Sequence, residues 1–251
     1  MKKIFYLLVI LPLVIVSCRK SPAPPIAEFT MEVTGDPEVG KEVRFVNNSR
    51  NAVSYDWEFG DGYGSTDQNP VYTYNSTGTF TVTLIAKGED GDEDQAELTV
   101  DVLIPTLLVV EVRDIDDETL VVTNASVLLY ESLSDWEAAD PAKSLMEGFT
   151  DKNGIAVFAN LDPYVYYADV LGGDYNNWML GLDFIRTPEV MPHQINWFVA
   201  WVEVNPQKSG LARGIQRIAP KAIIKMPKAP VNNHYVGTDA WKELYQMRSK
   251  K

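Results

Sequence analysis

Between residues 26 and 104 the hydrophobic side chains fall at every second position, for example at Phe80, Val82 and Leu84. A β-strand has a side-chain period of two, so this alternation predicts strands with one buried and one exposed face. Turn-forming residues separate the alternating segments. The pattern therefore predicts an all-β region with strands at 27–33, 42–47, 53–59, 79–87 and 96–103.

The most informative stretch is residues 55–62, with the sequence YDWEFGDG. In a strand, Tyr55, Trp57 and Phe59 lie on one face and the two acidic residues between them on the other. Three large rings on one face require a facing sheet that buries them. The glycines after Phe59 adopt positive φ without steric cost, so the chain can turn sharply there. This stretch predicts a core strand of a β-sandwich and its exit turn.

Further strand-like segments follow Pro105 and predict a second all-β unit over residues 105–204. A short helix is predicted at 134–139, between two strands, with Ser134 as its N-cap. The predicted strands of this unit are 107–113, 125–130, 155–159, 165–171 and 196–204.

Charge is distributed unevenly along the chain. Residues 19–205 contain 10 Lys and Arg against 33 Asp and Glu, a net charge of −23, whereas residues 206–251 carry a net charge of +8. Phosphate contacts require a basic face, so the acidic body excludes nucleic acid as a partner.

Residues 205–251 are predicted to form a basic and mostly irregular arm, because their prolines interrupt any long helix. A terminal helix is predicted at 238–247, where Trp241, Leu244 and Tyr245 follow helical spacing. This apolar stripe packs either on the second domain of its own chain or on a partner protein. Trp241 and Tyr245 are the candidate binding residues for the second alternative.

The N-terminus has the pattern of an export signal. Lysines precede an apolar run that is too short for a membrane span, so residues 1–17 are predicted to be a signal peptide. Residues 15–18 (IVSC) resemble a bacterial lipobox, which implies that Cys18 carries a lipid anchor; the alternative is an ordinary signal peptide with a chance cysteine. Cys18 is the only cysteine, so no intramolecular disulfide is possible. Residues 18–25 are then the anchor and a proline-rich tether.

The lipobox resemblance implies that the protein is attached to a membrane and does not span it. Arg19 and Lys20 follow Cys18, and a non-acidic residue at this point is compatible with the outer membrane. Surface-export signals of Bacteroidetes-type bacteria are usually acidic just after the cysteine. The expected location is therefore the outer membrane, on either its periplasmic or its surface face.

Motifs in the first β region resemble the polycystic-kidney-disease (PKD) domain family. The resemblance covers about residues 25–104, with the domain placed at 26–104, and it implies an immunoglobulin-like β-sandwich used for extracytoplasmic spacing and binding, with no reaction. Tyr72 departs from the family, which often has histidine there, while Tyr74 matches a recurrent tyrosine. The motifs are WEFGDG at 57–62, NPVYTY at 69–74 and GTFTVTL at 78–84.

The second region resembles the carboxypeptidase-regulatory, transthyretin-like sandwich domains, most clearly over residues 106–171. The predicted architecture is therefore all-β, with two tandem β-sandwiches followed by the basic arm. The segments that carry this resemblance are TDKNG at 150–154, NLDP at 160–163 and YVYY at 164–167.

The sequence contains no catalytic motif. His193 and His234 are isolated and are predicted to be surface or turn residues rather than catalytic or zinc-binding ones. There is no nucleophile elbow, phosphate-binding loop or dinucleotide fingerprint. We therefore predict a protein that is not an enzyme and needs no cofactor.

Calcium is the one metal that the sequence brings into question. Asp90, Asp92 and Asp94 place carboxylates at every second position, but Gln95 stands where an EF-hand loop requires glycine. The favoured interpretation is a solvated acidic hairpin that keeps an edge strand from pairing. The alternative is a looser calcium site in this hairpin or at Asp114, Asp116, Asp117 and Glu118.

Aromatic residues are concentrated in the second region, where most are expected to be core residues. Tyr175, Asn176 and Trp178 follow a glycine pair and are predicted to lie in a loop that offers a polar and aromatic binding surface. The predicted function is a non-catalytic envelope lipoprotein that acts as an accessory or scaffold subunit of an outer-membrane assembly. The alternative is a surface glycan-binding lipoprotein of a polysaccharide-utilisation system. The aromatic residues are Tyr164, Tyr166, Tyr167, Tyr175, Trp178, Trp197 and Trp201.

Overall fold

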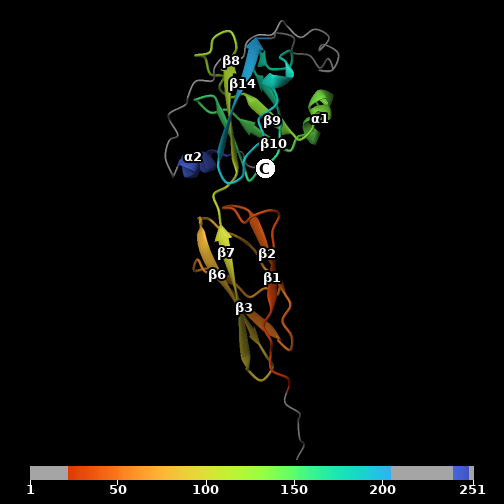
Figure 1. The fold of residues 1–251 in the computed structure, drawn as a ribbon, viewed down its shortest axis with the longest axis vertical. Helices are drawn as coiled ribbons and strands as arrows, with labels where there is room; N and C mark the ends of the chain where they lie inside the picture. Colours follow the sequence, from red (N-terminus) through yellow and green to blue (C-terminus); the bar gives the residue numbers. More distant parts are fainter. Residues whose placement is uncertain (1–21, 205–239, 249–251) are drawn as a thin grey trace, which may run out of the picture.

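The structure is a computed structural model that describes residues 22–204 and 240–248. The predicted signal peptide, Cys18 and His234 lie outside these ranges, as does most of the predicted basic arm. The described chain is mostly β-sheet and forms two domains that follow one another along the long axis of the molecule (Figure 1). Within it, no helix has the length and apolar character needed to cross a membrane.

The first domain is a sandwich of two antiparallel sheets, as an immunoglobulin-like fold requires. One sheet has the order β1-β2-β5 and is formed by β1 (Phe29–Glu32), β2 (Glu42–Asn47) and β5 (Val71–Thr73). The other has the order β4-β3-β6-β7 and is formed by β4 (Gly64–Ser65), β3 (Ser54–Glu58), β6 (Gly78–Lys87) and β7 (Glu93–Val102).

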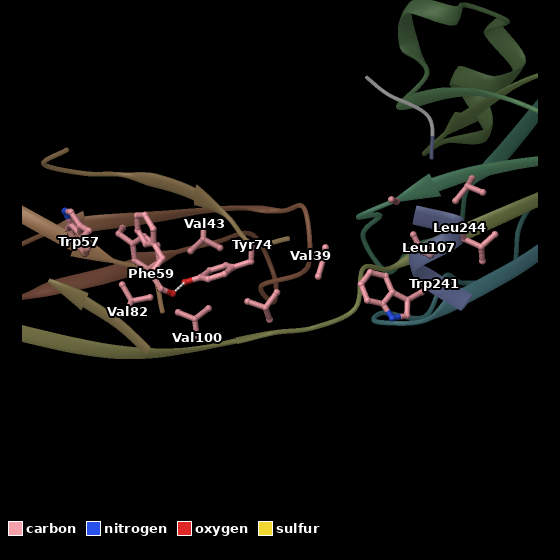
Figure 2. Packing of buried hydrophobic residues seen from close by; sticks show 14 of the residues in the cluster. Val39, Val43, Trp57, Phe59, Tyr74, Val82, Val100, Leu107, Trp241 and Leu244 are labelled. Carbon is pink, nitrogen blue, oxygen red and sulfur yellow. Dashed lines mark hydrogen bonds between the residues drawn. The ribbon is translucent and has the colours of Figure 1, made fainter. Parts of the chain in front are cut away.

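The predicted aromatic strand is the centre of the first domain. Trp57 is 2% exposed and packs against Phe45 of the facing sheet, with ring centroids 5.8 Å apart. The hydroxyl of Tyr74 donates a hydrogen bond to the carbonyl oxygen of Phe59, 3.0 Å away (Figure 2). At the turn that follows, Gly60 has φ +85°, and a Cβ there would lie 2.7 Å from the carbonyl oxygen of Thr81. The sequence prediction of a sandwich core and a glycine turn is therefore confirmed.

The second domain contains one seven-stranded sheet with the order β10-β9-β12-β13-β14-β8-β11. All neighbours are antiparallel except β8 and β14, which run parallel. The sheet folds over a shared core, so the domain is sandwich-like or barrel-like. Its strands are β8 (Leu107–Asp114), β9 (Ser126–Tyr130), β10 (Met146–Phe149), β11 (Ile155–Ala159), β12 (Tyr167–Gly172), β13 (Tyr175–Asn176) and β14 (Ile195–Val204).

Helices are few and short in the described chain. α1 (Leu133–Ala138) begins one residue before the predicted helix, and its N-cap is Ser132, not Ser134. The Ser132 hydroxyl oxygen accepts a hydrogen bond from the Asp135 amide, 3.1 Å away, which satisfies a donor of the first turn. The remaining helical elements are α2 (Ala240–Met247) and the 3₁₀ turns η1 (Pro141–Lys143) and η2 (Leu182–Phe184).

Two neighbouring strands of the second domain, β8 and the edge strand β11, are buried on both faces. Residues 107–112 of β8 and all of β11 are buried, whereas a strand with one solvent face alternates. One set of alternate side chains lines the core of the domain, and the other set packs toward the PKD-like domain and α2. Figure 1 shows α2 at the end of the second domain that faces the first.

Candidate functional site

The junction between the two domains contains a buried carboxylate. Glu38 lies in the segment between β1 and β2 and is only 4% exposed. It accepts hydrogen bonds from the Thr106 amide at 3.1 Å, the Thr106 hydroxyl at 2.6 Å and the Asn160 side-chain amide at 3.2 Å. A buried charge is tolerated only where such donors replace water. Glu38 of the first domain is therefore held by residues of the second.

His193 closes the exposed side of this network. Its backbone amide donates to the Thr106 hydroxyl oxygen at 3.0 Å, and its Nε2 lies 3.0 Å from Oδ2 of Asp36. Its Nδ1 lies 3.1 Å from Oε1 of Glu38 but is not aligned for a hydrogen bond. The residue has φ +53°, which is unusual for a side chain with a Cβ. The predicted turn histidine thus joins the two domains.

An apolar contact accompanies the polar network. A single cluster of buried side chains runs from the core of the first domain through Val39 to Leu107 of the second domain and to Trp241 and Leu244 of α2 (Figure 2). Leu107 and Leu244 are fully buried and Trp241 is 7% exposed. Of the two alternatives for the terminal helix, packing on its own chain is the one that the structure shows. Trp241 is consequently not available as a surface binding residue.

The predicted binding loop uses its polar groups internally. Asn176 is 2% exposed, and its side-chain oxygen accepts a hydrogen bond from the Trp178 amide at 3.2 Å. The indole N–H of Trp178 donates to Oδ1 of Asp169 at 2.8 Å. Burial and the neighbouring Asp114 raise the pKa of Tyr175. These contacts hold the loop against its own sheet, which corrects the prediction of an open binding surface at Asn176.

The acidic hairpin does not gather its carboxylates. Asp94 lies in β7, and its Oδ2 accepts a hydrogen bond from the Ala27 amide at 2.8 Å. Asp90 and Asp92 are exposed around the turn between β6 and β7. Across residues 22–204 and 240–248, no three Asp, Glu, His or Cys side chains are arranged to hold a metal ion. The calcium alternative therefore has no support from the geometry of this hairpin.

A shallow recess on the second domain was not predicted as a site. Its volume is about 320 Å³, and Tyr164 at its edge is 53% exposed. The backbone that forms it is fixed, because the amides of Thr187 and Val190 donate hydrogen bonds to the carbonyl oxygens of Tyr166 and Tyr164 at 2.8 and 2.9 Å. The cluster of tyrosines at 164–167 was the only sign of this recess in the sequence, and the sequence does not show which of these side chains is exposed. The recess is lined by Pro163, Tyr164, Val165, Tyr167 and Glu189.

Comparison with known proteins identifies the first domain. A family model described as PKD domain matches residues 20–102. The metalloprotease PrtV of Vibrio cholerae is 33% identical over 84 residues, which are 34% of this chain and 9% of that protein. The collagenase ColQ1 of Bacillus cereus is 50% identical over 50 residues, which are 20% of this chain and 5% of that protein. The chain thus spans less than a tenth of the length of these curated relatives.

Among solved structures, the crystal structure of the PKD1 domain from Vibrio cholerae PrtV aligns with a TM-score of 0.29 and 34% identity. The alignment covers 32% of this chain and 98% of that one. Such a domain fits a non-catalytic binding or accessory role. Residues 20–102 of this chain are a PKD domain.

Proposed function

We propose that the protein is a non-catalytic envelope lipoprotein of Bacteroidetes type, which acts as a scaffold subunit of an outer-membrane assembly. The observation that supports this role best is the fixed junction between its domains. Glu38, Thr106 and Asn160 join the domains by hydrogen bonds, and the hydrophobic cluster continues across the same boundary. A rigid pair of domains suits a protein that holds a partner at a set distance and orientation.

The position of Ala27 in the first domain supports the same role. The Ala27 amide donates a hydrogen bond to Asp94 near the β6–β7 turn, whereas Val39 lies at the opposite end of the domain, beside the second domain (Figure 2). The ten residues of β7 span this distance, which is about 34 Å at 3.4 Å per residue. Ala27, which follows Cys18 by nine residues in the sequence, is therefore separated from the second domain by the length of the PKD domain. The transthyretin-like motifs of residues 150–167 are consistent with a second binding module.

The lipid anchor is tested by the Cys18→Ser variant of the full-length chain in its native host. Wild-type protein is expected in the membrane fraction, and it should partition into the detergent phase. The variant should be released in soluble form. Ser21→Ala, three residues away, serves as the control and should remain membrane-bound. Retention of Cys18→Ser in the membrane would show that Cys18 is not the anchor.

The scaffold role is tested by purifying the lipidated full-length protein from native membranes in mild detergent after chemical crosslinking. A stoichiometric envelope protein is expected, crosslinked to the second domain. The Glu38→Ala variant should retain less of it, because the junction is weakened. Recovery of the protein alone, with and without crosslinker, would contradict the scaffold role.

A second candidate is glycan binding on the outer membrane, favoured by the recess at Tyr164. An exposed ring beside the carboxylate of Glu189 offers a stacking face and a hydrogen-bond acceptor, the two kinds of contact that sugars use. Retardation in gels that contain neutral polysaccharides measures binding. Tyr164→Ala should abolish retardation, and Phe149→Ala, which also removes an exposed ring of the second domain, should not. Equal migration of wild type and Tyr164→Ala in every gel would rule out the recess.

A further inference from the structure

The outer face of the second domain's sheet is apolar where it meets α2. Leu107 and Val109 of β8 and Ile155 and Val157 of β11 are at most 2% exposed, yet they belong to a different cluster from the side chains that line the core of the domain. Their strands pair directly, so the four side chains form one continuous surface. Without a covering element this surface would be open to water, which disfavours exposed apolar area.

α2 covers this surface with one side. Trp241 and Leu244 are buried in the cluster, whereas Lys242 and Glu243 between them are exposed. The spacing of three residues places the two buried side chains on the same face of the helix. The cluster also includes Val39 of the PKD domain (Figure 2). Residues of both domains therefore line the apolar surface on which α2 lies, which we call the groove.

Gly40 provides a notch for the next residue of this face. It has φ +82°, and a Cβ at this position would overlap the hydroxyl of Tyr245 and lie 2.8 Å from its Cζ. Only glycine lets the ring approach the backbone here, and the amide of Gly40 is fixed by a hydrogen bond to the carbonyl oxygen of Tyr74 at 2.9 Å. The guanidinium of Arg248 lies 3.7 Å from the centre of the Tyr245 ring. Tyr245 therefore connects α2 to the PKD domain.

α2 is too short to be stable by itself. It has eight residues, and isolated helices of fewer than about 12 residues are marginal in water. Its helical form therefore depends on the groove.

We propose that the surface shared by the two domains is a binding groove for an amphipathic helix, and that α2, its occupant, fixes the angle between the domains. The groove recognises a Trp and a Leu three residues apart, followed by a Tyr that enters the notch at Gly40. This inference goes beyond the scaffold role, because it specifies what controls the rigidity of the junction.

The test measures the distance between spin labels at Thr99→Cys in the PKD domain and Lys152→Cys in the second domain, in the full-length chain with Cys18→Ser. Wild type is expected to give one narrow distribution. Gly40→Ala should broaden it, because the notch is closed. Gly91→Ala is the matched control: Gly91 has φ +85°, but a Cβ there meets no described atom within 4 Å. Equal broadening by both variants would assign the effect to backbone strain and overturn the proposal.

Trp241→Ala is the second variant, with Glu243→Ala as its control on the exposed side of α2. Trp241→Ala should broaden the distribution while the circular dichroism spectrum of the sheets is retained. A synthetic peptide of residues 238–251 should then restore the narrow distribution when it is added in excess, and a peptide with alanine in place of Trp241 and Leu244 should not. An unchanged distribution in Trp241→Ala, or no restoration by the wild-type peptide, would overturn the groove as a helix-binding site.

Discussion

Replacing Glu38 by alanine tests whether the polar network at the junction stabilises the pair of domains. The substitution removes three hydrogen bonds to Thr106 and Asn160. Asn160 keeps a partner, because its amide also donates to the carbonyl oxygen of Val39 at 3.0 Å. The Thr106 amide, by contrast, has no other acceptor among the described residues, and Thr106 is 1% exposed. Most of the cost therefore arises at Thr106.

The expected loss follows from these contacts. A buried donor left without an acceptor costs about 1–3 kcal/mol, and a hydrogen bond to a charged group contributes about 1.5–3 kcal/mol. Removal of the buried carboxylate also relieves its own desolvation, which offsets part of the loss. We expect the free energy of unfolding to fall by about 2–4 kcal/mol. Glu38→Gln keeps an acceptor for Thr106 and should cost about 1 kcal/mol.

Urea unfolding of the full-length chain, followed by circular dichroism and tryptophan fluorescence, measures this change. Glu42→Ala is the control, since Glu42 is an exposed carboxylate four residues away and should shift the free energy by less than about 0.5 kcal/mol. If Glu38→Ala and Glu42→Ala unfold at the same urea concentration, Glu38 does not stabilise the junction. The hydrogen bonds of Glu38 would then no longer support a rigid pair of domains.

Two further outcomes are expected. Burial raises the pKa of Tyr166 from 10.0 to about 12, so its hydroxyl ionises more easily in the unfolded state. The free energy of unfolding is therefore unaffected by this group below pH 10 and falls as the pH rises from 10 toward 12. Tyr166→Phe should reduce the fall in stability over that pH range, and an unchanged pH profile would contradict this. Asn177 is fully buried and bonds the backbone of Ala168 and Val170, so Asn177→Ala should lower the free energy of unfolding by about 2–4 kcal/mol, whereas exposed Asn48→Ala should leave it nearly unchanged in thermal denaturation.

Local patterns predicted the strands well, because most strands of the PKD domain have one buried and one exposed face. Val82, Leu84 and Ala86 alternate in burial as expected. The two-residue and three-residue strands β4, β5 and β13 were missed, since such short segments carry no measurable period. The continuous apolar run of β8 predicted a strand. It did not predict that α2 covers one face of this strand, because α2 comes from the far end of the sequence.

The junction could not be predicted for a related reason. In the sequence, Glu38 looks like a solvated loop residue of an acidic protein, and its partners Thr106 and Asn160 lie 68 and 122 positions away. The contact of Trp178 with Asp169 could not be predicted either, because it is set by the packing of the loop on the sheet. Long-range contacts of polar residues leave no periodic signal.

The parallel pairing of β8 and β14 has a consequence for folding. In the described strands, β8 and β11 are connected to the rest of their sheet through β14, which pairs Ile195 with Leu107 across a long segment of sequence. Pairings of such long separation form slowly, because a large loop must close first. The PKD domain has all its strands by Val102, whereas the second domain waits for residues 195–204. A chain that emerges with its N-terminus first would complete the PKD domain while the second domain is still open.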